Sequence, residues 1–465
     1  MSVVWKKYIL LVCLLVLIIL NYKKIISFML FNDIFARQED KCDFINRIYK
    51  MNHFYGSKYQ LFFNKYKCCD DDNFSEIPYL SKEELIDFND VMITPPFKKC
   101  VLKCDNNSCI NDSLWYDKDC CIGQSTGGTS GKSTFIWMSK YNAYIYICTF
   151  MNSFKKNGYS YGDKIMIFYP SNSYFTNEYE KSNFYLLFFA NVYFLSFQRI
   201  DKEKTIEFVN SLNKNCPDLL VIFPFVLLQL CVNIQKYKMI IKHYPKNINL
   251  SGEFLLNCSL NFCKKTFVNS NIENTYGAVE FGEIAHQVKD DKNTFEVFNE
   301  FCYLENRDDK IVVTSLINDT FPIIRYVMED VGKIVNKNGK QYITDLIGKN
   351  TNQIIINNKK FTSLDVDKLI DFVNNSEKTI ISIVIEYDNT SMDIKYIIFN
   401  GLNKEEEKII EKKTNIFMNN YFSKNEMKYN VFFLQEYNHD YLKKFKIILK
   451  KDQTDSEPVG GYYKL

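Results

Sequence analysis

The sequence predicts an α/β protein, with a large N-terminal domain of layered mixed sheets with helices and a small mobile C-terminal α+β domain. Three observations predict this. Strand-like and helix-like patterns alternate between residues 135 and 250, as they do in sheets covered by helices. A polar turn at 348–352 interrupts the chain. Beyond it, strands and helices continue in a block of the size of one small domain.

Length and composition allow several domains and argue against nucleic acid as a partner. The chain has 465 residues, of which 46% are hydrophobic and 24% are charged, as is ordinary for globular domains. A net charge of +3 gives little attraction for a phosphate backbone. The 15 cysteines are an odd number, so reduced thiols are favoured over a disulfide framework. Several cysteines crowd between Cys100 and Cys121 without a C-x-x-C pair, and a zinc site there stays open.

Residues 1–31 form the first segment, and residues 3–31 within it are the candidate membrane anchor. Tyr8–Leu20 contains no strongly polar side chain, and lysines flank it on both sides. A membrane span needs about 20 apolar residues, so this run is short unless the lysines extend toward the interface. No small-x-small cleavage site follows it. We expect an uncleaved anchor that spans or lies on the membrane, with a buried N-terminal helix as the alternative.

The large domain is expected over residues 41–347. Ile77–Leu85 is typical of an extended piece followed by a helix that Ser81 caps. Further on, the patterns predict a strand at Phe135–Met138, a helix at 139–157, a turn at Gly162-Asp163, strands at Lys164–Tyr169, Leu219–Phe223 and Asn247–Leu250, and helices at Ile206–Asn213 and Phe225–Ile234.

The small domain is expected over residues 348–465. Its predicted elements are a hairpin at Gln353–Phe361, helices at Leu364–Asn374 and Glu405–Asn420, and strands at Thr379–Tyr387 and Ile394–Phe399. A basic cluster, Tyr441–Lys446, precedes a final strand. A solvated surface patch is the default interpretation of its lysines.

One loop of the large domain has the composition of a phosphate-binding segment. It contains three glycines, four hydroxyl side chains and a lysine within eight residues. Glycines let backbone N–H groups converge on an anion, and the hydroxyls and the lysine add donors and charge. The loop consists of Ser125, Thr126, Gly127, Gly128, Thr129, Ser130, Gly131 and Lys132.

Three functional interpretations of this loop compete with a plain surface loop. A Walker-type loop fits at Gly131-Lys132-Ser133, but Thr126 stands where its first glycine is required. A hydrolase nucleophile elbow, G-x-S-x-G, fits at Gly123–Gly127 with Ser125 as the nucleophile. The third pattern, [ST]-[ST]-G-[GT]-T-[ST]-G-K, fits at every position and resembles the phosphate loop of adenylate-forming enzymes.

Polar clusters that follow this loop in the chain contain the residue types that nucleotide-binding sites use. Asn274–Glu280 places an amide, an aromatic ring, a glycine and a carboxylate close together, and Ser251-Gly252-Glu253 follows a predicted strand. Later, Phe321–Tyr326 leads into Glu329-Asp330. An aromatic face can stack on a purine, and a carboxylate can hold Mg²⁺ or ribose hydroxyls. Each cluster alone is more often a turn or a structural ion pair, so only the order of the clusters favours a nucleotide site.

In this order the motifs resemble those of the adenylate-forming (acyl-CoA synthetase-like) superfamily over residues 77–450. Within it they are most similar to phenylacetate–CoA ligases and to capsular-polysaccharide-biosynthesis proteins of the CapK type. The matching segments are Ile77–Leu85, Ser125–Lys132, Gly162–Lys164, Ser251–Glu253, Asn274–Glu280, Arg325-Tyr326 with Asp330, and Gly348-Lys349.

The resemblance implies an AMP-forming ligase. A small carboxylic acid would attack the α-phosphate of ATP, giving an acyl-adenylate and pyrophosphate. The acyl group would then pass to coenzyme A, or to an amine or hydroxyl on a sugar or lipid carrier. ATP chemistry belongs on the cytosolic side, so we expect the catalytic domain on the cytosolic face of the membrane.

The resemblance also implies roles for individual residues. The ATP-binding set would be Ser125–Gly131, Ser251, Gly252, Glu253, Asn274, Tyr276, Gly277, Asp330 and Lys349, and the catalytic set would be Lys132, Glu280 and Lys444. Within them, Tyr276 would stack on adenine, Asn274 would bind its amine, and Asp330 would bind the ribose. Glu280 would hold Mg²⁺. The small domain would rotate about Lys349 and deliver Lys444 to the reacting atoms.

The sequence departs from the family pattern at several positions. Val279 replaces a threonine, Glu329 replaces a turn glycine, Lys349 replaces an arginine, and Lys443 replaces a loop glycine. These changes leave a catalytically weakened nucleotide- or acyl-binding descendant as an alternative. His286 and Cys302 have no companion cysteine nearby, so no zinc site is predicted from them. The acid pocket is expected from Leu219–Ile234 and Ala278–Ile284, whose apolar character favours an aromatic or aliphatic acid.

Overall fold

The computed structural model describes residues 40–95, 121–125, 135–160, 162–170, 191–254, 256–289, 291–349, 353–357, 359–374, 380–422, 427–435 and 447–451. The predictions for residues 3–31, Thr126–Lys132 and Lys443-Lys444 lie outside these residues. Among the described helices, none has the length and apolar character needed to cross a membrane.

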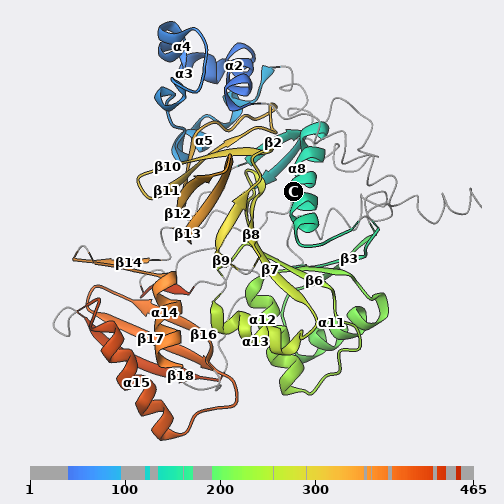
Figure 1. Ribbon diagram of the computed structural model, residues 1–465, viewed down its shortest axis with the longest axis vertical. Coiled ribbons are helices and arrows are strands. Elements are labelled where there is room, and N and C mark those ends of the chain that lie inside the picture. The colour runs from blue at the N-terminus through green and yellow to red at the C-terminus, as the bar shows by residue number, and fades with distance from the viewer. Residues whose placement is uncertain are drawn as a thin grey trace, which may run out of the picture.

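One mixed sheet of eleven strands forms the centre of the large domain (Figure 1). Its strand order is β10-β11-β12-β13-β9-β8-β7-β6-β5-β3-β4. The parallel part consists of β3 (Ile165–Pro170), β4 (Val192–Phe197), β5 (Leu219–Ile222), β6 (Asn247–Ser251) and β7 (Asn271–Ala278). The antiparallel part consists of β8 (Gly282–Val288), β9 (Asp291–Val297), β10 (Cys302–Arg307), β11 (Lys310–Ser315), β12 (Tyr326–Lys337) and β13 (Lys340–Lys349). The predicted α/β class with mixed sheets is therefore confirmed.

Helices cover both faces of the parallel strands because alternate strand residues point to opposite sides. Leu220 and Ile222 of β5 pack in a core with α11 (Lys202–Asn215), α12 (Pro224–Lys236) and α13 (Asn257–Thr266). Leu219 and Val221 of the same strand pack with α8 (Lys140–Lys156). The predicted strands and helices from residue 135 to residue 250 are confirmed within a few residues at their ends.

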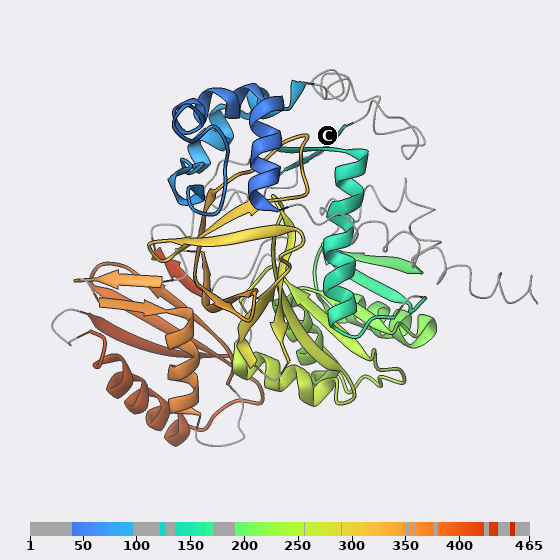
Figure 2. The ribbon, with the colours of Figure 1, turned by 45° about the horizontal axis from the view of Figure 1, so that its top comes forward.

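A group of short N-terminal helices packs on the antiparallel end of the sheet (Figure 2). The helices are α2 (Lys41–Met51), α3 (His53–Lys58), α4 (Gln60–Tyr66), α5 (Lys82–Asp87) and α6 (Asn89–Met92). As predicted, Ser81 caps α5, and its hydroxyl accepts from the Glu84 N–H at 3.2 Å while the Glu84 carboxylate accepts from the Ser81 N–H at 2.9 Å. The sequence reasoning assigned no helix between residues 41 and 66.

Arg325 joins these helices to the sheet. Its side chain is 1% exposed, and its guanidinium donates to Glu305 on β10 through two bonds of 2.9 and 2.8 Å. It also donates to the Ser75 carbonyl at 2.9 Å and lies 4.1 Å from the centre of the Tyr79 ring. Desolvation raises the pKa of the Glu305 carboxyl, although the Arg325 charge opposes that rise. Arg325 is therefore a structural centre, although it belongs to a motif that resembles a nucleotide-binding segment.

The C-terminal domain is built on a four-stranded sheet in the order β18-β17-β16-β19. Its strands are β16 (Ile380–Tyr387), β17 (Ser391–Ile398), β18 (Lys428–Leu434) and β19 (Ile448–Lys450), with the hairpin β14 (Gln353–Ile356) and β15 (Lys359–Thr362) before them. Helices α14 (Ser363–Val373) and α15 (Lys404–Met418) pack on one face of the sheet. The other face meets α13, where Ser259 Oγ donates to the Ile381 carbonyl at 2.7 Å. The α+β character is confirmed, and β18 is a strand that the sequence reasoning missed.

Cysteines in this structure are thiols. The nine cysteines whose side chains the structure describes are all free, and seven of them are buried. Burial raises the pKa of the Cys148 and Cys258 thiols to about 12, so both stay protonated. These thiols pack as small apolar groups.

Candidate active site

The site lies where the parallel strands end. Ile222 of β5 lies beside Leu250 of β6, and Ser251 lies beside Thr275 of β7. The residues that follow these strands therefore meet at one edge of the sheet. In open α/β sheets this carboxyl edge is where ligands bind. Two sequence-predicted segments, Ser251–Glu253 and Gly277–Glu280, share it.

A bulged hairpin from β7 to β8 shapes the middle of this edge. The register shifts between Tyr276 and Gly277. A Cβ at Gly277 would come within 2.6 Å of the Gly282 carbonyl oxygen and 2.9 Å of Glu283 Oε2, so only glycine fits. A turn closed by the Phe281 N–H on the Ala278 carbonyl, at 3.0 Å, places Glu280 at the tip. The structure thus puts Asn274–Ala278 on a strand and Glu280 in its terminal turn.

Tyr276 and Asp330 come together from distant parts of the chain. The Tyr276 hydroxyl donates to Asp330 Oδ2 at 3.0 Å across a separation of 54 residues. The ring is 9% exposed, and burial together with the Asp330 carboxylate raises the pKa of the Tyr276 phenol well above its usual value. The phenol is therefore a neutral donor that orients the carboxylate.

Lys349 belongs to the same region of the sheet. In the β12–β13 ladder it lies directly opposite Asp330. Its ammonium is 4.0 Å from Glu329 Oε2, and Lys82 of α5 approaches the other oxygen of that carboxylate at 3.2 Å. Glu329, which stands where the family pattern has a glycine, thus joins α5 to the end of β13. Tyr276, Asp330 and Lys349, which the sequence analysis grouped, are close in space.

Asn274 has a buried oxygen that no described residue satisfies. Its backbone N–H donates to Gln287 Oε1 at 3.1 Å. Its side-chain Oδ1 is buried without a hydrogen-bond partner within the described part of the chain. Buried polar atoms are seldom left in this state, so Asn274 fits a ligand that donates a hydrogen bond.

Two residues that the sequence analysis did not select support the predicted ones. Gln287 binds the backbone of Asn274, and Glu283 accepts from Ser251 Oγ at 3.2 Å. Glu283 and Gln287 are 3% and 8% exposed, which is unusual for such polar residues. The strand β8 shows no polar–apolar alternation that would have marked them in the sequence, because Gly282–Gln287 are all buried.

Glu253 has a structural contact at the start of α12. Its Oε2 accepts from the Phe225 N–H at 3.0 Å. A carboxylate at this position satisfies an otherwise unpaired N–H and interacts favourably with the helix dipole. Gly252 precedes it with φ of +89°, a conformation that favours glycine. Gly252 therefore turns the chain after β6 so that Glu253 reaches α12.

The predicted phosphate loop connects two antiparallel strands. It leaves β1 (Cys121–Ser125) and returns in β2 (Phe135–Ser139), with Ser125 opposite Phe135. A Walker loop and a nucleophile elbow both lead from a strand into a helix. The first described element after the loop is the strand β2 and not a helix, which favours the adenylate-forming pattern over the Walker loop and over Ser125 as a hydrolase nucleophile. The loop residues themselves lie outside the described part of the chain.

His286 is not part of a metal site in the part of the chain that the structure describes. It stacks on Phe298 with ring centres 5.5 Å apart, and burial lowers its pKa to about 4. No group of three His, Cys, Asp or Glu side chains that could hold a metal ion occurs among the described residues. Cys100 to Cys120 lie outside them.

Structural comparison identifies the fold. Two solved structures of 2-hydroxyisobutyryl-CoA ligase in the postadenylation state, in complex with 2-HIB-AMP and with R3-HIB-AMP, match with TM-scores of 0.63 and 0.62. They are 14% and 12% identical in sequence, and each match covers 90% of this chain and 89% of the other. This chain has the fold of an adenylate-forming ligase. No protein-family model matches the sequence, and no curated protein matches it.

The same ligase in the thioesterification state, in complex with 2-HIB-AMP and CoA, matches with a TM-score of 0.50 at 14% identity over 90% of each chain.

Proposed function

We propose that this chain is an AMP-forming ligase that activates a carboxylic acid with ATP and then transfers the acyl group. The contact of Tyr276 with Asp330 is the main support. It brings a residue proposed to stack on adenine against one proposed to bind ribose, at the edge of the sheet where this fold has its ligand site. Buried Asn274 Oδ1, which needs a donor, suits the exocyclic amine of adenine.

The triphosphate would be bound on the other side of Tyr276. Thr126, Thr129 and Lys132 of the loop between β1 and β2 are proposed to contact its β- and γ-phosphates. Glu280 fits as the protein ligand of Mg²⁺, because it stands in the half-buried turn after β7, at the carboxyl edge. When bound, this ion supplies charge neutralisation on the triphosphate.

The proposed reaction has two steps. First, a carboxylate oxygen of the acid attacks the α-phosphorus and pyrophosphate leaves, so that an acyl-adenylate forms. Second, a thiol attacks the acyl carbon and AMP leaves. The protein contributes mainly by holding the reacting atoms in line and by placing fixed positive charge around the phosphates. Lys444 is proposed to approach the carboxylate and α-phosphate in the first step.

The acid is proposed to be aromatic or aliphatic. Tyr169 at the end of β3 stacks on Phe223 after β5, with ring centres 4.6 Å apart and planes 7° apart, so an aromatic wall stands at the carboxyl edge. The expected pocket stretch Leu219–Ile234 includes α12, part of which is fully buried. Its Leu227, Leu230 and Cys231 have no exposed surface and belong to the core between helices and sheet.

Coenzyme A is the acceptor that we propose first, because the matched ligase structures are those of a CoA ligase. An amine or hydroxyl on a sugar or lipid carrier, as the similarity to CapK-type proteins implies, is the second candidate. It would suit a protein anchored to a membrane through residues 3–31 with its catalytic domain on the cytosolic face. Extraction of the membrane fraction with carbonate and with detergent tests that anchor.

Exchange of labelled pyrophosphate into ATP, measured with a panel of carboxylic acids, tests the function. We expect acid-dependent exchange in the wild-type protein and its loss in Glu280→Gln and Lys444→Ala. ATP binding without exchange for any acid would instead support the weakened, binding-only descendant. Unchanged exchange in both variants would refute the roles given to Glu280 and Lys444.

A further inference from the structure

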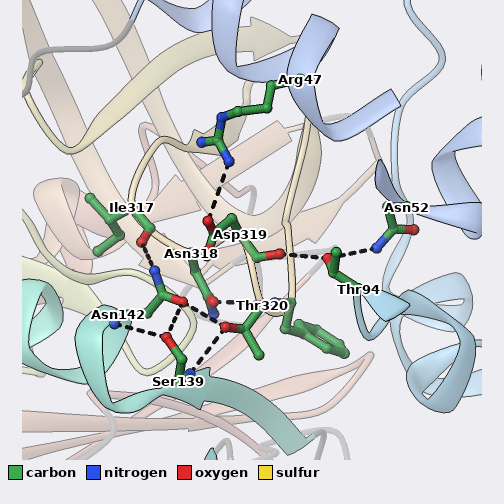
Figure 3. Close-up of polar contacts among 10 residues, drawn as sticks. Arg47, Asn52, Thr94, Ser139, Asn142, Ile317, Asn318, Asp319 and Thr320 are labelled. Carbon is green, nitrogen blue, oxygen red and sulfur yellow. Dashed lines mark hydrogen bonds and ion pairs between the residues drawn. The ribbon is translucent and has the colours of Figure 1, made fainter. Parts of the chain in front are cut away.

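A buried polar network borders strand β2 of the β1–β2 hairpin (Figure 3). Its centre is the segment Ile317–Thr320, which connects β11 to β12. Asn318 and Thr320 are 3% and 0% exposed, and Asn142 at the start of α8 is 2% exposed. Buried polar side chains are retained when they hydrogen-bond fully, so the bonds of this network define what it holds.

Two side chains of the segment bind the backbone of β2. Asn318 Nδ2 donates to the Trp137 carbonyl at 2.9 Å, and the Ser139 N–H donates to Thr320 Oγ1 at 3.1 Å. On its other side, β2 pairs with β1. The hairpin is a separate two-stranded sheet, so these side chains take the place of a third strand.

Asn142 completes the connection to α8. Its Oδ1 accepts from Thr320 Oγ1 at 2.6 Å, and its Nδ2 donates to the Ile317 carbonyl at 2.7 Å. Ser139 caps the helix by accepting from the Asn142 N–H at 3.1 Å. The end of β2, the first turn of α8 and the segment 317–320 are thus held as one unit.

The same segment is fixed from the opposite side by the N-terminal helices. Thr94 Oγ1 donates to the Asp319 carbonyl at 2.5 Å, and the Thr94 N–H donates to the Thr320 carbonyl at 2.9 Å. Arg47 of α2 reaches Asp319 Oδ2 at 3.3 Å. Beyond Thr320 the chain passes the buried Arg325 and enters β12, which holds Asp330. One rigid stretch therefore links the hairpin to the proposed ribose site.

We propose that Ile317–Thr320 anchors the β1–β2 hairpin, and that Thr320 and Asn142 are positioning residues for the phosphates of ATP. The positioning role rests on the proposed function, because it requires that the loop between β1 and β2 binds ATP. The anchoring of the hairpin by Ile317–Thr320 does not depend on the proposed function. Thr320 touches no phosphate in this account; it fixes the end of the strand that leaves the loop.

The test compares Thr320→Val, which removes the hydroxyl, with Thr320→Ser, which keeps it. Thr205→Val is the matched control. Thr205 lies in α11 and is also 0% exposed. Its Oγ1 donates to the Asp201 carbonyl at 2.6 Å and accepts from Asn233 at 2.9 Å, so this hydroxyl too is fully engaged. We expect amide hydrogen exchange in peptides covering 121–125 and 135–139 to accelerate at least tenfold in Thr320→Val only. Asn318→Ala is a second variant with the same expectation, should Thr320→Val fail to fold.

Kinetics then separate positioning from stability. In pyrophosphate exchange, Thr320→Val should raise the KM for ATP about tenfold and leave the KM for the acid unchanged, and Thr320→Ser should restore it. Unaltered hydrogen exchange at 135–139 in both Thr320→Val and Asn318→Ala would overturn the anchor. If the KM for ATP of Thr320→Val equalled that of Thr205→Val, the positioning role would be overturned. A wild-type protein without pyrophosphate exchange would refute the proposed function and the positioning role with it, while hydrogen exchange would still decide the anchor.

Discussion

Tyr276 has two separable parts in this site, a ring and a hydroxyl. The ring is proposed to stack on adenine, whereas the hydroxyl donates to Asp330 at 3.0 Å. A hydrogen bond to a charged acceptor contributes about 1.5–3 kcal/mol, and its donor also fixes the orientation of the carboxylate. The two roles can be separated by substitution.

Tyr276→Phe is predicted to raise the KM for ATP about tenfold, since about 1.4 kcal/mol corresponds to that factor. The ring is kept, so kcat should change less than the KM. Asp330→Asn, which retains the size of the side chain, is the companion variant. If Tyr276→Phe left the KM for ATP unchanged, Asp330 would not depend on Tyr276 for its orientation.

His286 is predicted to make the protein sensitive to mild acid. Burial, with the Lys156 charge as a smaller cause and Glu296 in opposition, lowers its pKa from 6.5 to about 4 in the folded state. Between these values the unfolded chain binds a proton that the folded chain does not. Stability is therefore complete above pH 6.5 and falls as the pH decreases to about 4, by up to about 3 kcal/mol.

Urea unfolding at several pH values measures this effect. His286→Gln removes the titrating group and keeps a polar side chain of similar size. We expect its free energy of unfolding to fall less steeply than that of the wild-type protein between pH 6.5 and 4. Parallel curves for the two proteins would mean that His286 does not contribute.

At the scale of elements, the buried ion pair of Arg325 and Glu305 joins β10, β12 and the stretch around Ser75. Its Arg325 side chain is 1% exposed and that of Glu305 is 16% exposed. Removing one partner of such a pair leaves an uncompensated buried charge, which costs about 3–5 kcal/mol. The pair therefore controls the attachment of the N-terminal helices.

Arg325→Met is predicted to destabilise the large domain by about 3–5 kcal/mol in urea unfolding. The double variant Arg325→Met with Glu305→Gln should lose less, because no unpaired carboxylate remains. Lys333→Met is a surface control, because Lys333 contacts Asp345 at 2.8 Å with its side chain 72% exposed. Equal stability of the single and double variants would show that the charge of Glu305 is tolerated alone.

Elements also show how local sequence determined structure. The capped start of α5, the helix α8 and strands β3, β5 and β6 follow from short-range patterns, because a helix with one buried face leaves a periodic sequence and a strand covered on both faces leaves a short apolar run. Strand β18 was missed. It lies at the edge of its sheet, and it pairs in parallel with β17, so its partner gives no hairpin signal.

At the scale of the molecule, the two domains meet in a buried interface, where Ile381 and Val384 of β16 pack with the core around α12 and α13. Ser259 Oγ on α13 donates to the Ile381 carbonyl of the C-terminal domain at 2.7 Å. This bond belongs to the interface on α13, so its removal would weaken the domain placement that the structure shows. One neutral hydrogen bond contributes about 0.5–1.5 kcal/mol.

Ser259→Ala is therefore predicted to change the ratio of pyrophosphate exchange to the CoA-dependent step, measured from preformed acyl-adenylate, by about two- to tenfold. Ser211→Ala on α11, whose hydroxyl accepts from Asn215 at 3.1 Å, is a control within the large domain. An equal loss in both half-reactions would indicate a general loss of stability and not a shift between the two domain placements.

The sequence by itself determined the α/β class, most elements, the composition of the phosphate loop and the order of the motifs. These depend on neighbouring residues, which a linear pattern contains. Only the tertiary structure decided that Tyr276 meets Asp330, that Arg325 is buried, and that Thr320 holds β2. Each of these features depends on contacts between residues far apart in the chain. Strand order and packing bring those residues together, and neither strand order nor packing leaves a local signal in the sequence.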